Sequence, residues 1–154
     1  MRDSPIELLI NSSNNVQVCA HDYGGSGPDV LFCHATGFHG RYWDPICIRM
    51  KEKFRCVTLD LRGHGNSFIP EGLQMDWTGM AEDVLAAIKS LDLQNPFAVG
   101  HSMGGSSILL AEQMEKGTFK GGWLFEPIVI GEEAIPLEMS KGNRLAISAR
   151  KRKE

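Results

Sequence analysis

The stretch FAVGHSMGGSS, residues Phe97–Ser107, decides the fold of this chain. It begins with a short apolar run, which is typical of a strand covered on both faces. The residues that follow predict a helix over Met103–Lys116, with Gly117 as its stop. A strand that turns directly into a helix raises its corner side chain above the sheet, and flanking glycines leave room for the bend. Ser102 occupies that corner.

The rest of the chain alternates between the same two patterns. Short apolar runs predict strands at residues 14–24, 29–34, 55–60, 96–100 and 121–128. Helices are predicted at Pro45–Phe54, at residues 78–93 and at Met103–Lys116, and the second has an apolar stripe formed by Met80, Val84, Ala87, Ile88 and Leu91. Strands alternating with helices require right-handed crossovers, so the fold class is α/β, a mainly parallel sheet with helices on both faces.

The corner at Ser102 is also the expected position of a catalytic group. Gly100, Ser102 and Gly104 form the pattern G-x-S-x-G. The helix that begins at Met103 presents unpaired N–H groups and a partial positive charge, which suit a developing oxyanion. The alternative is a plain Gly-Ser turn, but the placement between a strand and a helix favours a nucleophilic serine.

Three segments, taken together, resemble a known family. HATGFHG (34–40), LDLRGHGNS (59–67) and VGHSMGG (99–105) look like successive signatures of the α/β-hydrolase superfamily, in its order and at its spacing. The resemblance covers nearly the whole chain, from the first predicted strand through LFEPI. It implies a serine esterase or lipase-like enzyme that forms an acyl-enzyme with a small-molecule ester, without a cofactor or a metal.

The resemblance also implies residue roles. Ser102 matches the nucleophile, and the N–H of Met103 matches one donor of the oxyanion hole. Thr36 matches the other donor, with Phe38 as the alternative if the glycine loop has another register. Glu126, after the last predicted strand, matches the position where some members carry the acid; alternatively, it is a strand-end carboxylate balanced by a helix N-terminus or an arginine.

The family places its acid and then its histidine after the nucleophile, yet no histidine follows Ser102. The resemblance therefore implies an N-terminal portion that lacks the last strands and the catalytic histidine. Residues 1–136 are expected to form part of the hydrolase core and residues 137–154 the start of a truncated cap helix. Such a chain is predicted to be weak or inactive alone, and its exposed last strand predicts self-association.

The five histidines of the chain are His21, His34, His39, His64 and His101. His101 neighbours the serine, but adjacent strand side chains point to opposite faces. His34 and His39 lie on the expected oxyanion loop, where a base is badly placed for the leaving group. His21 is expected to be remote from Ser102. His64 is interpreted, with Arg62, as a group that fixes its loop.

Composition and charge argue against several classes of protein function. The 154 residues carry a formal net charge of -3, which argues against a general nucleic-acid binder. No apolar run approaches the length that spans a bilayer. The four cysteines lack a C-x-x-C pair, so neither a metal site nor a disulfide framework is expected, and the protein is predicted to be cytoplasmic. A non-catalytic binding protein on the same fold, and cofactor-free haloperoxidase or C–C hydrolase chemistry, remain alternatives.

Overall fold

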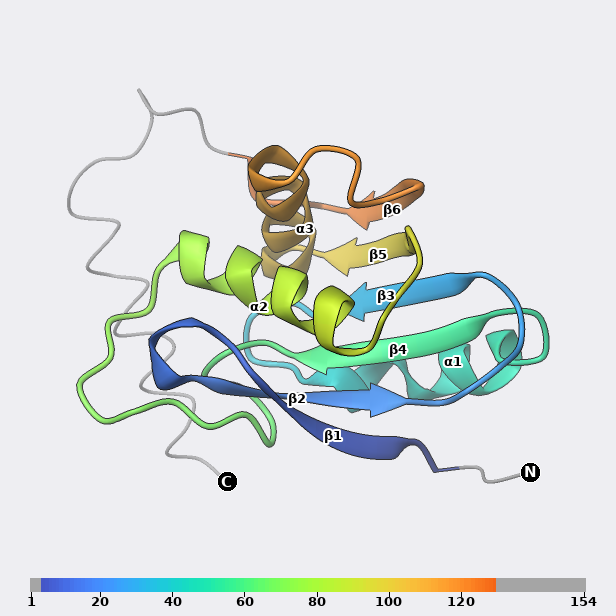
Figure 1. The fold of residues 1–154 in the computed structure, drawn as a ribbon, viewed down its shortest axis with the longest axis horizontal. Helices are drawn as coiled ribbons and strands as arrows, with labels where there is room; N and C mark the ends of the chain where they lie inside the picture. The colour runs from blue at the N-terminus through green and yellow to red at the C-terminus, as the bar shows by residue number, and fades with distance from the viewer. Residues whose placement is uncertain (1–3, 130–154) are drawn as a thin grey trace.

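The computed structural model describes residues 4–129, which form a six-stranded sheet with helices on both faces (Figure 1). The strands are β1 (Ile6–Asn11), β2 (Gln17–Asp22), β3 (Asp29–Cys33), β4 (Arg55–Asp60), β5 (Phe97–His101) and β6 (Gly121–Phe125). The helices are α1 (Asp44–Met50), α2 (Trp77–Ser90) and α3 (Met103–Met114), with short 3-10 turns η1 (Ser13–Asn15) and η2 (Gly40–Trp43).

The sheet has the order β1-β2-β4-β3-β5-β6. Strands β4, β3, β5 and β6 are parallel neighbours, whereas β1 and β2 pair antiparallel at one edge. Helices α2 and α3 cover one face, and α1 lies behind the sheet in Figure 1. The predicted α/β class is therefore confirmed.

Several details differ from the sequence prediction. The helix α3 ends at Met114, two residues before the predicted end at Lys116. The strand β1 was not predicted; Leu9 interrupts the alternation of Ile6, Leu8 and Ile10, and most of its residues are exposed. Consequently His21 lies on the second strand rather than the first. The helix expected at Pro45–Phe54 ends at Met50, and η2 precedes it.

The core forms where the apolar sides of the elements meet. One cluster lies between the sheet and the helices α2 and α3, and it includes Leu31, Leu59, Val84 and Met103. A smaller cluster on the α1 side includes Phe32 and Trp43. The stripe predicted for α2 is confirmed at its buried residues Met80, Val84 and Ala87. Helix α2 starts where the side chain of Asp76 accepts a hydrogen bond from Gly79 N–H (2.6 Å), a standard N-cap.

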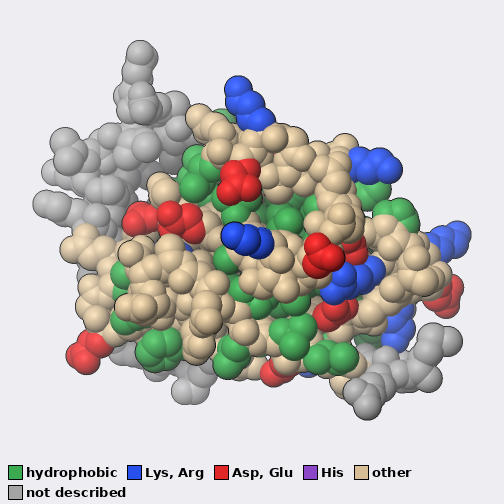
Figure 2. Space-filling view, viewed as in Figure 1, with side chains coloured by type: hydrophobic (Ala, Val, Ile, Leu, Met, Phe, Trp, Pro, Cys, Tyr) green, Lys and Arg blue, Asp and Glu red, His purple; other side chains and the backbone are tan. Residues whose placement is uncertain are grey.

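On the face shown in Figure 2, basic and acidic side chains are interspersed and do not gather into one basic patch. None of the helices within residues 4–129 is long and apolar enough to cross a membrane. The segment 137–154, expected to begin a cap helix, lies outside the described residues.

Strand β6 forms one edge of the described sheet, and its side chains are largely exposed. Trp123 is 73% exposed and Phe125 53% exposed. Within residues 4–129, β6 pairs with β5 on one side only, and it is one of the two edge strands of the sheet.

Candidate active site

The candidate site lies at the carboxyl ends of β3 and β5. These two strands are parallel, and Cys33 pairs with Gly100, so the loop after β3 and the turn after β5 begin side by side. From β3 the chain crosses to β4 on one side, and from β4 it returns to β5 on the other side of β3. Such a switch of direction opens a crevice at the carboxyl ends of the strands, where α/β proteins bind ligands.

Ser102 stands at the corner between β5 and α3. Its backbone has φ 48° and ψ −114°, a strained conformation for a residue other than glycine. Its N–H donates a hydrogen bond to the carbonyl of Phe125 (2.9 Å), which ties the corner to β6. The helix begins at the next residue, Met103, as the sequence predicted.

The glycines of the motif are required by close backbone contacts. A Cβ on Gly100 would lie 2.7 Å from the Cα of Gly105. A Cβ on Gly104 would lie 2.3 Å from the carbonyl oxygen of Cys33 and 2.7 Å from that of His34. Helix α3 can therefore approach β5 and the end of β3 only because these residues lack side chains.

The loop after β3, residues 34–40, contains the second expected oxyanion donor. The N–H of Phe38 donates to the carbonyl of Ala35 (3.1 Å) and so is already used within a turn. Thr36 is half-buried and lies within this turn. Both expected donor positions therefore lie in the loop that follows β3.

Asp60, at the end of β4, holds this loop and the next one together. Its carboxylate accepts hydrogen bonds from Gly40 N–H (2.6 Å) and Asn66 N–H (2.8 Å), and its Oδ1 lies 3.1 Å from His21 Nε2. Burial alone would raise its pKa, but the contacts with His21 and with the two N–H groups lower the pKa of Asp60 below its ordinary value. The ionised Asp60 is thus a fixed anchor beneath the site.

Arg62 is buried and forms an ion pair with the equally buried Asp83 of α2. Its Nε donates to Asp83 Oδ2 (2.9 Å) and its Nη2 to Asp83 Oδ1 (2.8 Å), while its backbone N–H also donates to Oδ2 (3.0 Å). A Cβ on Gly79 would lie 1.9 Å from Arg62 Nη1, so that glycine makes room for the guanidinium. The prediction that Arg62 fixes its loop is confirmed.

His34 and His64 are also bonded to backbone groups. Leu61 N–H donates to Nε2 of His34 (3.1 Å), so Nδ1 carries the proton and donates to the carbonyl of Ala35 (2.8 Å). Burial lowers the pKa of His34 to about 4. His64 donates from Nδ1 to the carbonyl of Arg62 (3.1 Å), and its ring centroid lies 5.0 Å from that of His34.

The other three histidines have different surroundings. His101 packs its ring on Phe125, with 5.1 Å between centroids. His21 lies between Glu7 and Asp60 near the opposite edge of the sheet, and His39 is exposed. Among the hydrogen bonds found within residues 4–129, none joins Ser102 Oγ to an imidazole.

Glu126 directly follows the residue whose carbonyl accepts the Ser102 N–H. Its carboxylate is exposed, and its backbone has a positive φ of 46°. It therefore lies at the carboxyl end of β6, on the same edge of the sheet as Ser102.

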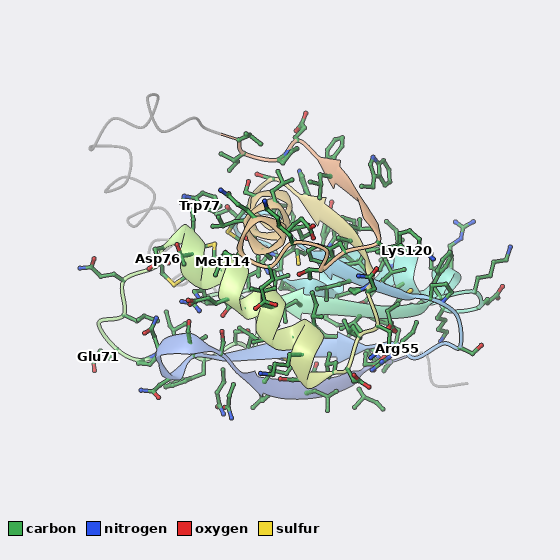
Figure 3. The ribbon with its side chains drawn as sticks, turned by 45° about the horizontal axis from the view of Figure 1, so that its top comes forward. Arg55, Glu71, Asp76, Trp77, Met114 and Lys120 are labelled. Atoms are coloured by element: carbon green, nitrogen blue, oxygen red, sulfur yellow. The ribbon has the colours of Figure 1, made fainter. Side chains whose placement is uncertain are left out.

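A shallow apolar pocket of about 240 Å³ lies against the outer side of α3. Its lining includes Trp77, Leu109 and Ile128, and Figure 3 shows Trp77 at the start of α2, beside α3. Ser106 also lines it and donates from Oγ to the carbonyl of Ile128 (2.7 Å). Ser102 is not part of the lining, so this pocket does not identify an acyl-binding site.

Sequence reasoning missed the two buried carboxylates that organise the site, Asp60 and Asp83. The only signal for Asp60 was a charged residue at the end of an otherwise buried strand. Asp83 lies on the buried side of α2 within an otherwise apolar environment, and a buried carboxylate usually has a cationic partner.

Comparisons with known proteins agree with this architecture. The sequence profile described as "Alpha/beta hydrolase family" matches residues 30–151. A non-heme chloroperoxidase of Burkholderia pyrrocinia is 31% identical over 154 aligned residues, which cover 90% of this chain and 54% of that protein. A 3-oxoadipate enol-lactonase of Acinetobacter baylyi is 32% identical over 84 residues, or 54% of this chain and 31% of that protein.

Among solved structures, an epoxide hydrolase from Vigna radiata superimposes with a TM-score of 0.79 at 20% identity, over 92% of this chain and 45% of the other. At that identity the similarity demonstrates a shared fold. The chain spans about half, or less, of the length of these relatives.

Proposed function

Because the chain belongs to the α/β hydrolase family, we propose that it carries the nucleophile and the oxyanion-binding part of a serine hydrolase of carboxylic esters. The observation that carries the proposal is the strained corner at Ser102, held between β5 and α3 by the contacts of Gly100 and Gly104. Strain of this kind is kept where it exposes a reacting side chain.

In the proposed reaction Ser102 Oγ attacks the ester carbonyl carbon, and the carbonyl oxygen becomes an oxyanion. The N–H groups of Met103 and Thr36 donate to it. Collapse of this intermediate expels the alcohol and leaves an acyl group on Ser102, and attack by water then releases the acid. The Asp60 anchor at Gly40 supports the proposal, because it fixes the loop that carries Thr36.

The proton of Ser102 requires a base. Among the hydrogen bonds described within residues 4–129, none joins an imidazole to Ser102 Oγ, and we propose that full activity needs a further histidine as the base. Glu126 is the proposed acid that would orient it. Without its base a triad enzyme keeps only the contribution of the oxyanion hole and of binding.

The test uses a fluorophosphonate probe and p-nitrophenyl acetate on the chain itself. We expect slow labelling that maps to Ser102, is abolished by Ser102→Ala, and persists in Ser90→Ala, which changes an exposed serine of α2. Ester hydrolysis should stay barely above background. Labelling of another residue, or no labelling at high probe concentration, would contradict the assignment of Ser102 as the nucleophile. Vigorous ester hydrolysis by the isolated chain would contradict the proposal that a further base is needed.

A second candidate is cofactor-free haloperoxidase chemistry, favoured by the similarity to the chloroperoxidase of Burkholderia pyrrocinia. In that reaction hydrogen peroxide would replace water in the attack on the acyl group of Ser102, and the released peracid would oxidise a halide. Halogenation that depends on a carboxylic acid, hydrogen peroxide and Ser102 would support it. Ester hydrolysis without such halogenation would favour the first candidate.

A further inference from the structure

Away from the elbow, three side chains with metal-binding atoms converge on β1 and β2. Glu7 lies directly opposite His21 in the antiparallel register, and Cys19 precedes His21 by two residues. All three side chains therefore project from the same face of the sheet. A carboxylate oxygen, a ring nitrogen and a thiol sulfur from these residues all lie within 4.8 Å of one another.

His21 supplies an independent observation. Its side chain is 0% exposed, and within the described part of the chain neither ring nitrogen makes a hydrogen bond of good geometry. Nδ1 lies 3.5 Å from Glu7 Oε1, and Nε2 lies 3.1 Å from Asp60 Oδ1. If Nε2 carries the proton toward Asp60, the Nδ1 lone pair faces the carboxylate of Glu7. Two facing acceptors repel each other unless a proton or a metal ion lies between them.

We propose that Glu7, Cys19 and His21 bind a divalent transition-metal ion of the Zn²⁺ class. Carboxylate, thiolate and imidazole are the ligands that Zn²⁺ takes in proteins. Tetrahedral bonds of about 2.0–2.3 Å place neighbouring ligand atoms about 3.3–3.8 Å apart, a spacing that the 3.5 Å between Glu7 Oε1 and His21 Nδ1 already meets. The side chain of Glu7 is 48% exposed, so it can adjust and a water molecule can complete the coordination.

Asp60 supports this site from behind. In metal sites, a carboxylate beside the second ring nitrogen of a ligating histidine orients the ring, and Asp60 Oδ1 lies 3.1 Å from His21 Nε2. Asp60 itself is held by the N–H groups of Gly40 and Asn66. The proposed site is thus linked through one carboxylate to the loop that carries the oxyanion donor.

Two further side chains approach the carboxylate of Glu7. Arg41 Nη1 lies 4.0 Å from Glu7 Oε1, and Asn66 Nδ2 lies 3.4 Å from Glu7 Oε2. Arg41 makes its closer ion pair with Asp44 (2.7 Å), so Glu7 can turn to the metal without leaving the guanidinium unpaired.

Co²⁺ titration of the chain tests the proposal, because a cobalt–thiolate bond gives a near-ultraviolet charge-transfer band. We expect the band in the wild type and in Cys33→Ala, which removes another buried strand thiol, and its loss in Cys19→Ala. Glu7→Gln should weaken Co²⁺ and Zn²⁺ binding by at least about tenfold, whereas Glu52→Gln, an exposed control on another loop, should not.

Several outcomes would overturn the site. They are the absence of the band, its persistence in Cys19→Ala, or equal affinity in Glu7→Gln and the wild type. Each would contradict the binding of a metal ion by Glu7, Cys19 and His21. Because Glu7 is half-exposed on an edge strand, its variant keeps the test valid even if Cys19→Ala does not fold. None of these outcomes depends on the role of Ser102.

Discussion

Gly104, in the first turn of α3, lies against the carbonyl group of Cys33 at the end of β3: a Cβ added to the glycine would come within 2.3 Å of that oxygen. This contact sets the distance between the helix that presents the Met103 N–H and the loop that begins at His34. The two proposed halves of the oxyanion hole are therefore joined by one backbone contact that tolerates no side chain.

Gly104→Ala should consequently destabilise the protein and separate the two donors. Because the obstacle is backbone rather than a flexible side chain, we expect a loss of about 2–4 kcal/mol in the free energy of unfolding. Urea denaturation measures it, and probe labelling of Ser102 should slow in parallel. Gly121→Ala is the control, since its Cβ would meet nothing closer than 3.8 Å. Equal stability of Gly104→Ala and the wild type would contradict the contact.

Arg62→Met should be among the most destabilising single changes outside the apolar core. It leaves the buried carboxylate of Asp83 without its partner, and breaking a buried pair from one side costs about 3–5 kcal/mol. Thermal denaturation compares it with Arg49→Met, which removes an exposed arginine of α1 and should change stability by less than about 0.5 kcal/mol. A similar effect of the two variants would show that the pair contributes little.

The burial of His34 predicts a pH dependence of stability. Its pKa is about 4 in the folded protein and 6.5 when unperturbed, so between these values the unfolded chain binds a proton that the folded chain does not. Stability is then fully present above about pH 6.5 and falls as the pH drops toward 4. The expected loss from this group between pH 7 and pH 5 is about 2 kcal/mol.

Urea midpoints at the two pH values test this prediction. His34→Gln should reduce the pH dependence, whereas the exposed His39→Gln should retain it. The lowered pKa of Asp60 predicts a further loss at more acid pH, as that carboxylate becomes protonated in the folded protein. An unchanged pH dependence in His34→Gln would assign the effect to other groups.

The β6 edge predicts self-association of the chain. Its outer backbone groups lie beside the exposed side chains of Trp123 and Phe125, a combination that templates strand pairing. Sedimentation should show concentration-dependent association that Trp123→Lys reduces, because a charge on an edge strand opposes pairing. Phe68→Lys changes an exposed aromatic residue outside the strands and should have a smaller effect. A stable monomer at high concentration would contradict the prediction.

Much of the fold was predictable because it depends on local pattern. The buried strands at residues 55–60 and 96–100 and the stripe of α2 show their periodicity within a few residues. Strand β1 was not predictable in this way, since Leu9 interrupts its apolar alternation and most of its residues are exposed. Its position follows from pairing with β2, which is a tertiary contact.

The sequence by itself determined the corner at Ser102, because a strand, a glycine-flanked serine and a helix start are adjacent along the chain. Only the tertiary structure decided which polar groups surround it. Asp60 meets Gly40 and His21, and Asp83 meets Arg62, across separations of 20 residues or more. Those contacts depend on how strands and helices that are distant in the sequence align with one another. No local sequence pattern encodes that alignment.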